Sequence, residues 1–511
     1  MPMPSRPFPF AFLILPLFVA LFRPAGAAAP AADSRPSFVL LMGDDHGWDE
    51  TGYNGHPYLK TPVLDEMART GLRLDRFYSG GSSCSPTRGT VITGRHHNRY
   101  GTFAPGWSLR PEEISIARLL REGGYATGHF GKWHLGPVKA DSPTNPGRMG
   151  FDEWLSHDNF FELDPWLSRN GGPPERFKGE SSEIIVAEAR RFIDRARSAG
   201  KPFLAVIWFG SPHEPYSGLP ADLALYDRLP DTFGNRKVKL TSNETGRPVE
   251  RLQREVLRER FAEITAMDRS IGQLRSHLAS AGARENTVLW YCGDNGTPPE
   301  AVATVPFRAQ KGSVYEGGIR VPGVIEWPAR IRAPRATAVN AVTSDILPTL
   351  CELAGRPLPA RPLDGISLVG LLEGRLESRP APICFWDGRA RADARTPYID
   401  PELQKGTTPL AKLGGDGATR NFLNYRQTDI RPEDFAGSLA IVDNRFKLVV
   451  DGAARRGTGG ASVKELFDLR ADPAERNDLA AKHPDEVARL HGRLRAWQES
   501  VLGSLTGADY R

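Results

Sequence analysis

The chain has 511 residues, of which 40% are hydrophobic and 25% are charged, and its formal net charge is +5 at pH 7. This composition excludes a disordered chain and leaves room for two globular domains. Acidic and basic residues are interspersed without a Lys/Arg block, so we expect no nucleic acid as a partner. The four cysteines form no C-x-x-C pair and have no regular spacing, which excludes a recognisable disulfide framework.

The N-terminus has the pattern of a signal peptide over residues 1–27. Arg6 precedes an apolar run at 8–22, and small residues at 25–27 resemble a cleavage site. The alternative is a membrane anchor, but the run is short and contains two prolines, whereas a spanning helix needs about 20 apolar residues. We therefore predict an exported protein, periplasmic or secreted, with no stable membrane anchor after cleavage.

Downstream of this leader, short β-rich apolar runs alternate with helical patterns. Runs with the composition of strands buried on both faces lie at 37–43, 125–131, 203–210, 287–293 and 322–328. Helical patterns lie at 112–124, 181–200 and 257–278. The alternation predicts an α/β fold, with a large domain over 35–380 whose mostly parallel central sheet is flanked by helices.

The alternation of strand and helix patterns ends near residue 380. Residues 438–450 and 464–480 have the pattern of strands joined by turns, and residues 484–502 have the pattern of a closing helix. We predict a smaller C-terminal α+β domain over 381–505, with an antiparallel sheet and that helix.

Four of the apolar runs stop at a glycine-flanked group of reactive side chains. In open α/β sheets, ligands bind at the edge where the carboxyl ends of the strands meet. The groups that should meet there are Asp44 and Asp45, Lys132 and His134, His213, and Asp294 and Asn295.

The oxygen-bearing residues of this set suggest a metal site. Asp44, Asp45, Asp294 and Asn295 offer carboxylate and amide oxygens and no soft ligand, which suits Ca²⁺, or else Mg²⁺, better than zinc. Taken singly, each pair also fits an ordinary turn or a solvated loop. Their joint occurrence at the ends of two buried strands favours the metal.

The basic residues of the set suggest acid–base chemistry. Lys132 and His134 are two apart, so an extended chain presents both on one side and Trp133 on the other. The alternative is a surface lysine beside a core histidine. His213 and Lys311 lie in loops, where such residues are often idle, and neither is informative alone.

Cys84 is an unusual residue for an exported chain, where thiols are oxidised. Pro86 suits the first turn of a helix that ends at Gly94, which places Cys84 at a helix N-terminus with Arg88 one turn along. One interpretation is a thiolate nucleophile of low pKa. Enzymes of that kind, however, need no cluster of metal-binding carboxylates.

Taken together, these residues resemble the formylglycine-dependent sulfatase family, part of the alkaline-phosphatase-like superfamily. The resemblance rests on "DDHGW", "CSPTRGTVITGR", "GKWHLG", "SPHEPY", "CGDNG" and "KGSVYEGGIRVP". It implies an alkaline-phosphatase-like fold, with 35–380 as the catalytic domain. It further implies that a formylglycine-generating enzyme oxidises Cys84 during export, although Thr87 stands where many relatives have serine.

The resemblance also implies roles for the site residues. The hydrated formylglycine at position 84 attacks sulfur, assisted by Asp294 and a cation held by Asp44, Asp45, residue 84, Asp294 and Asn295. His134 takes a proton to release sulfate, and Arg88 holds the residue-84 side chain. Lys132 and Lys311 balance charge on the sulfate, and His213 or Lys311 protonates the leaving oxygen.

The implied substrate is a sulfated carbohydrate, because the motifs look closest to arylsulfatases and N-acetylgalactosamine-6-sulfatases. Two alternatives stay open. Some members of the superfamily use the same modified residue on phosphate or phosphonate esters, and an exported sulfated-glycan-binding protein would keep the pocket without catalysis. The second alternative predicts the loss of a catalytic position, and none is missing from the motifs.

Overall fold

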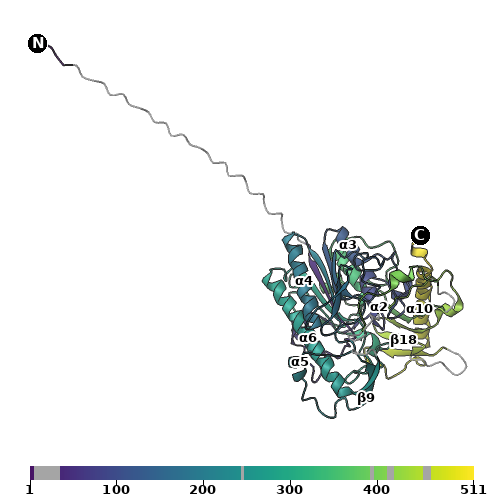
Figure 1. Cartoon of the computed structure of the whole chain (residues 1–511). Coiled ribbons are helices and arrows are strands. Elements are labelled where there is room, and N and C mark those ends of the chain that lie inside the picture. Colours follow the sequence, from purple (N-terminus) through teal and green to yellow (C-terminus); the bar gives the residue numbers. More distant parts are fainter. Residues whose placement is uncertain (5–34, 243–246, 392–395, 411–418, 453–461, 511) are drawn as a thin grey trace.

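The computed structural model describes residues 1–4, 35–242, 247–391, 396–410, 419–452 and 462–510 (Figure 1). Residues 5–27 of the predicted signal peptide lie outside these ranges. Among the described residues, no helix combines the length and the apolar character that a membrane crossing requires.

A ten-stranded sheet forms the centre of the larger part of the molecule, with strand order β14-β2-β13-β11-β1-β8-β4-β5-β6-β7. The strands, in that order, are Arg335–Thr337, Leu72–Leu74, Gly323–Glu326, Thr287–Gly293, Ser37–Gly43, Phe203–Trp208, Ala126–Lys132, Glu153–His157, Trp166–Arg169 and Pro174–Arg176. The central strands β11, β1, β8, β4 and β5 are parallel to their neighbours within that group, as predicted. β13 runs antiparallel to β11, a direction that its buried composition does not specify.

Helices cover both faces of this sheet because alternate residues of each central strand face opposite ways. The helices are α1 Pro62–Thr70, α2 Cys84–Thr93, α3 Ile116–Glu122, α4 Ser181–Ser198, α5 Pro220–Ala224, α6 Gln253–Ser280, α7 Glu316–Ile319, α8 Ile346–Leu353 and α9 Val369–Leu372. On β1, Phe38 and Leu40 pack in a core with α2, α3 and α8, whereas Val39 and Leu41 pack with α1, α4 and α6. The predicted layered α/β architecture is confirmed.

A second sheet near the C-terminus is antiparallel throughout. Its strands are β16 Ile383–Asp387, β17 Ser438–Val442, β18 Phe446–Val450 and β19 Lys464–Asp468. One face packs on α10 (Pro484–Leu505), which Figure 1 shows beside β18. The predicted antiparallel sheet and closing helix are confirmed, and the domain boundary near residue 380 stays a prediction.

Short strands complete the described structure. β3 (Phe77–Tyr78) pairs with β12 (Arg320–Val321) and β15 (Ala341–Val342), and β9 (Lys237–Thr241) pairs with β10 (Pro248–Leu252). The cysteines Cys84, Cys292, Cys351 and Cys384 are all free thiols, so no disulfide links the described residues.

A buried ion pair joins the small sheet to the loop region around α7. Lys447 Nζ lies 3.0 Å from Glu316 Oε1 and 2.8 Å from Glu475 Oε1, and all three side chains are fully buried. Taking charges out of water is costly unless each has a partner. Lys447 therefore contributes to the attachment of the small sheet, together with the apolar contacts that the sheet makes with Tyr315 and Ile319.

We expect Lys447→Met to lower the free energy of unfolding by about 3–5 kcal/mol, because it leaves two buried carboxylates without their cation. Urea denaturation followed by fluorescence measures the change. Lys464→Met, on the half-buried Lys464 of β19, is the matched control and should stay within about 0.5 kcal/mol of the wild type. Equal behaviour of the two variants would contradict the prediction.

Candidate active site

The carboxyl ends of β11, β1, β8 and β4 meet at one edge of the large sheet. Gly43 of β1 is level with Gly293 of β11, and Met42 is level with Trp208 of β8. Residues that follow these strands therefore converge. We call the following residues the polar cluster: Asp44, Asp45, Cys84, Arg88, Lys132, His134, His213, Asp294, Asn295 and Lys311.

A glycine makes this convergence possible. A Cβ atom on Gly293 would lie 2.1 Å from the carbonyl oxygen of His46, closer than any real contact. Gly293 thus lets the chain after β11 approach the chain after β1. Asp45 N donates to Asp294 Oδ1 at 2.8 Å across this contact.

Helix α2 carries Cys84 and Arg88 into the cluster. It begins at Cys84 and ends at Thr93, and it is capped by Gly94, whose φ of +69° suits a residue without a side chain, so the predicted helix is confirmed. Cys84 is 1% exposed, and its Sγ lies 3.6 Å from Asp45 Oδ1. Ser85 Oγ donates to the carbonyl oxygen of His134 at 2.6 Å, which fixes the helix against the end of β4.

Arg88 binds the carboxylates of the cluster. Its Nη2 lies 2.8 Å from Asp294 Oδ2 and 3.3 Å from Asp44 Oδ1, and all three side chains are fully buried. Its Nη1 donates to the carbonyl oxygen of Lys132 at 3.1 Å. Arg88 therefore holds two carboxylates together that would otherwise repel each other.

Each lysine of the cluster is paired with one aspartate. Lys132 Nζ donates to Asp44 Oδ2 at 2.6 Å, and Lys311 Nζ donates to Asp45 Oδ2 at 2.6 Å. Burial alone would raise the pKa of both carboxyls, but the nearby cations outweigh it. The pKa of Asp44 is held well below its usual range, and that of Asp45 is lowered to about 2.

Asp294 and Asn295 complete the acidic side of the cluster. Burial, and then the charge of Asp44, raise the pKa of Asp294 to about 7. Asn295 Nδ2 donates to Asp45 Oδ1 at 2.9 Å. Because carboxylates this close resist ionising together, a divalent cation would stabilise their charged form.

The two histidines of the cluster follow different strands, His134 after β4 and His213 after β8. His213 Nε2 lies 3.6 Å from Asp45 Oδ2, and its ring stacks on Phe160 at 5.0 Å between centroids. Burial lowers the pKa of His213 to about 4. Burial, then Lys132, lowers the pKa of His134 well below its usual range. Both rings are therefore neutral near pH 7 and able to accept protons.

As predicted, Lys132 and His134 both reach the cluster whereas Trp133 points into the core. The backbone conformation that achieves this differs from the extended chain that we expected. Trp133 is fully buried and stacks on Trp208 at 6.1 Å, whereas Lys132 ends β4 in the cluster. His134 has a φ of +55°, so the chain turns after Lys132 instead of continuing extended. Within the described residues, neither ring nitrogen of His134 has a hydrogen-bond partner, although both are buried.

The structure argues against a thiolate at Cys84. Burial raises the pKa of the Cys84 thiol, even though Lys132 and Lys311 oppose the shift, and Asp294 and Asp44 raise it further. The helix N-terminus therefore does not suffice to ionise this thiol, and the interpretation of a low-pKa cysteine nucleophile is disfavoured.

The ligand atoms of Asp44, Asp45, Cys84 and His213 lie within 4.8 Å of one another, which is close enough to hold one metal ion. Sequence reasoning placed His213 only as an acid. Two buried oxygens are available to a cation: Asn295 Oδ1 and Asp44 Oδ1 accept no hydrogen bond among the described residues, although Asp44 Oδ1 lies 3.3 Å from Arg88 Nη2.

Sequence reasoning missed one supporting ion pair beneath the cluster. Arg260 donates to Glu50 Oε1 at 2.6 Å through Nε, to the carbonyl oxygen of Asp45 at 2.6 Å through Nη2, and to the carbonyl oxygen of Pro212 through Nη1. It thereby ties the loop of Asp45 to the loop of His213. Arg260 lies three residues after the buried Leu257 of α6, on the face of the helix that packs in the core. A charged residue at such a position indicates a buried ion pair and could have been noticed in the sequence.

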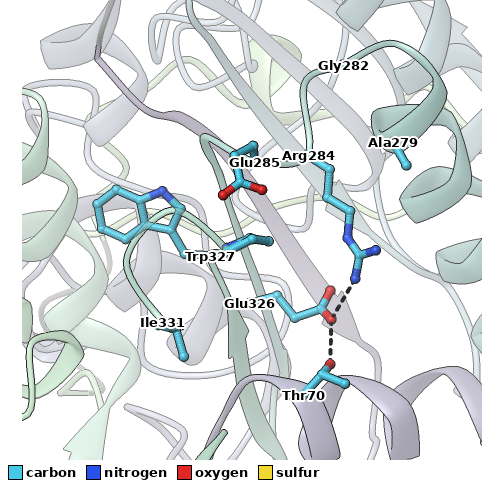
Figure 2. Close-up of a pocket in the computed structure, with 9 residues that line it drawn as sticks. Thr70, Ala279, Gly282, Arg284, Glu285, Glu326, Trp327 and Ile331 are labelled. Carbon is cyan, nitrogen blue, oxygen red and sulfur yellow. Dashed lines mark hydrogen bonds and ion pairs between the residues drawn. The ribbon is translucent and has the colours of Figure 1, made fainter. Parts of the chain in front are cut away.

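A separate open pocket of about 480 Å³ lies away from the cluster (Figure 2). Glu326, which lines it, is level with Leu289 near the start of β11, whereas the cluster follows the end of that strand. Arg284 and Thr70 both donate to Glu326 Oε1, at 3.3 and 3.1 Å. This pocket is at the opposite end of the sheet and forms no part of the site.

Comparison with known proteins agrees with this geometry. Residues 36–356 match the sulfatase family, and the chain belongs to that family of sulfuric ester hydrolases. It is 31% identical to N-acetylgalactosamine-6-sulfatase of Canis lupus familiaris over 396 residues, covering 70% of each chain. It is also 31% identical to an ulvan-active sulfatase of Formosa agariphila over 480 residues, covering 92% of this chain and 82% of the relative.

A solved structure, that of Ps i-CgsB in complex with k-i-k-neocarrahexaose, has the same fold. The superposition has a TM-score of 0.70 at 20% sequence identity and covers 91% of this chain and 93% of that one. The alkaline-phosphatase-like architecture expected from the motifs is thus confirmed.

Proposed function

We propose that this chain is an exported enzyme that hydrolyses sulfate monoesters of carbohydrates. The observation that carries the proposal is the position of Cys84, which begins α2 and lies 3.6 Å from Asp45 in a cluster that holds cations and carboxylates together. The names of the two relatives, which act on a sulfated amino sugar and on ulvan, support a carbohydrate substrate. Simple aryl sulfates should also be turned over.

The proposal assigns Cys84 as the precursor of formylglycine, made by a maturation enzyme during export. The buried, protonated thiol suits a precursor better than a nucleophile. We assign Ca²⁺, with Mg²⁺ as the alternative, to Asp44, Asp45, residue 84, Asp294 and Asn295. When present, the hydrated aldehyde supplies the hydroxyl that attacks sulfur, and the cation stabilises the negative charge that develops.

The other residues of the cluster have roles that follow from their positions. Lys132 and Lys311 each already face a carboxylate at 2.6 Å, and they stabilise sulfate oxygens that bind between them. His134, neutral and without a partner in the described residues, takes the proton when sulfate departs. His213 or Lys311 supplies a proton to the leaving oxygen, and of the two Lys311 is the one protonated near pH 7, because burial opposes its charge but Asp45 outweighs burial and raises its pKa. Arg88 keeps Asp44 and Asp294 in place.

Two measurements test the proposal. The first compares kcat/KM on 4-nitrophenyl sulfate and 4-nitrophenyl phosphate, and we expect the sulfate to be preferred. The second is the mass of the peptide that contains Cys84, which should be lighter by about 18 Da and should react with a hydrazine. Preference for phosphate would favour a phosphate or phosphonate ester hydrolase. Binding of sulfated sugars without turnover, despite the modification, would favour a glycan-binding protein.

Removal of the cation gives a further prediction. Dialysis against EDTA should lower kcat on 4-nitrophenyl sulfate by about 100-fold or more, because a bound metal contributes several kcal/mol of charge stabilisation. It should also lower Tm, since the cation binds only the folded chain and separates repelling carboxylates. Re-addition of Ca²⁺ should restore both quantities. Activity and Tm that are unchanged in a metal-free sample would refute the cation assignment.

A further inference from the structure

One guanidinium group lies beside the polar cluster and takes no part in its ion pairs. Arg420 begins a segment in which burial alternates: Phe422 and Asn424 are buried, whereas Leu423 is 41% exposed. Alternate side chains of an extended segment point the same way, so Arg420 and Phe422 face inward together. The Phe422 ring lies 6.3 Å from the ring of His134.

A chain of hydrogen bonds links this segment, through the loop at 406–408 and the end of β5, to the residue after β4 that carries the His134 ring. Gly406 N donates to the carbonyl oxygen of Arg420 at 2.9 Å, and Thr408 N donates to Asp158 Oδ2 at 2.7 Å. The carbonyl oxygen of Asp158 in turn accepts from His134 N at 3.2 Å. The backbone of Arg420 is therefore connected to that of His134 by three hydrogen bonds, one of which is accepted by the Asp158 side chain.

The charge of Arg420 reaches the reacting residues. After burial and Lys132, it is the next cause that lowers the pKa of His134. Gly106 leaves room for the guanidinium, because a Cβ atom there would lie 2.9 Å from Arg420 Nη1. The side chain thus packs against the backbone of Gly106, whose carbonyl oxygen accepts from Leu423 N in the same segment at 2.8 Å.

Arg420 differs from the other cations of the site in having no counter-ion among the described residues. Arg88, Lys132 and Lys311 each bind a carboxylate of the cluster. In the described part of the chain, the buried Nε of Arg420 has no hydrogen-bond partner and no carboxylate forms an ion pair with its guanidinium. A half-buried cation without a partner is energetically unfavourable. An anionic group of a bound molecule would stabilise the Arg420 guanidinium beside the site.

We infer that Arg420 binds a second anionic group, either a carboxylate or a further sulfate, on the carbohydrate whose sulfate ester is hydrolysed at residue 84. The planar fork of a guanidinium matches both oxyanions. This inference rests on the proposed function and adds that the C-terminal part of the chain selects doubly anionic substrates. Arg420 is then a specificity-determining residue outside the sulfate-binding lysines.

The test compares kcat/KM of wild type, Arg420→Ala, Arg420→Lys and Arg426→Ala on probes that differ by one anion. The probes are 4-nitrophenyl sulfate, N-acetylgalactosamine 6-sulfate free or linked to glucuronate, and glucosamine 6-sulfate with or without a 2-N-sulfate. Arg426 is the matched control, because it lies nearby in the chain but stacks on Tyr398 and faces Glu112 at 3.9 Å.

We expect wild type to prefer at least one doubly anionic probe over its singly anionic counterpart. Arg420→Ala should lower kcat/KM on that probe by about 10- to 100-fold, the effect of losing a charged hydrogen-bond pair, and should leave 4-nitrophenyl sulfate within about twofold. Arg420→Lys should keep part of the preference, and Arg426→Ala should keep all of it. The preferred pair, glucuronate or N-sulfate, identifies the anion.

Two results would overturn the inference while leaving the sulfatase assignment intact. One is a wild-type enzyme that hydrolyses 4-nitrophenyl sulfate but shows no preference within either pair. The other is an equal loss on all probes in Arg420→Ala, which would place the guanidinium on the scissile sulfate itself. If wild type carrying formylglycine hydrolyses no sulfate ester, the proposed function fails, and the inference fails with it.

Discussion

Cys84→Ala is expected to lower kcat on 4-nitrophenyl sulfate by about 10⁴-fold or more, the range seen when an enzyme loses its nucleophile. Alanine cannot be oxidised to the aldehyde, so the variant has no attacking group. Its fold should persist, because Cys84 is a small buried residue at the first position of α2 and forms only a weak contact with Asp45. Initial rates at saturating substrate measure the loss, and circular dichroism checks the fold.

Cys292→Ala is the matched control for this variant. Cys292 lies in β11 and is 2% exposed. Its replacement by alanine is therefore the same chemical change at a comparably buried position. It should retain kcat within about twofold and lose about 1 kcal/mol of stability from the smaller side chain. Residual activity of Cys84→Ala above one per cent of wild type, in protein free of wild-type contamination, would show that residue 84 is not the nucleophile.

The convergence of the polar cluster was predictable because it follows from local patterns and one general rule. Buried β-rich runs identify parallel strands, and parallel strands bring their carboxyl ends to one edge, which is how Asp44 and Asp294 meet. The start of α2 at Cys84 was equally local, because Pro86 favours a first turn and Gly94 favours a helix end.

The remaining features depend on contacts between distant segments, which no short pattern encodes. The direction of β13 is set by its pairing with β11 and not by its composition. The alternating burial around Arg420 has no counterpart in the sequence, where Phe422 and Leu423 are adjacent. Arg420 is brought to the site by its hydrogen bond from Gly406 and by the docking of the 406–408 loop on Asp158. Strands β5, β6 and β7, which the sequence analysis did not predict, extend one side of the large sheet. They are short and partly polar, so their sequence gives little indication of a strand.

Arg88→Met should have the largest combined effect on stability and activity. Methionine replaces the aliphatic part of the arginine side chain but removes the cation between Asp44 and Asp294, which are both fully buried. Breaking a buried pair by removing one partner costs about 3–5 kcal/mol of unfolding free energy. The folded fraction that remains should turn over 4-nitrophenyl sulfate about 10²- to 10³-fold more slowly, because the carboxylates lose their positions.

The pH dependence of this loss has a definite sign. Burial, then Asp44, already raise the pKa of Asp294 to about 7 in the wild type, and removal of the Arg88 charge raises it further. A carboxyl whose pKa is higher in the folded than in the unfolded state contributes most stability at low pH, and that stability is lost as the pH rises through the folded pKa. In chelator-containing buffer, Arg88→Met should therefore be destabilised more at pH 8 than at pH 5.

Arg379→Met separates this effect from the general cost of an unpaired buried charge. Arg379 binds Asp345 at 2.6 Å in a buried pair outside the polar cluster. It should lose similar stability, yet its folded fraction should keep wild-type kcat. Urea denaturation at both pH values, together with kcat corrected for the folded fraction, distinguishes the variants. If the stability lost in Arg88→Met does not increase between pH 5 and pH 8, the charge of Arg88 does not stabilise the ionised form of Asp294 beside Asp44. The role given to Arg88 would then be wrong.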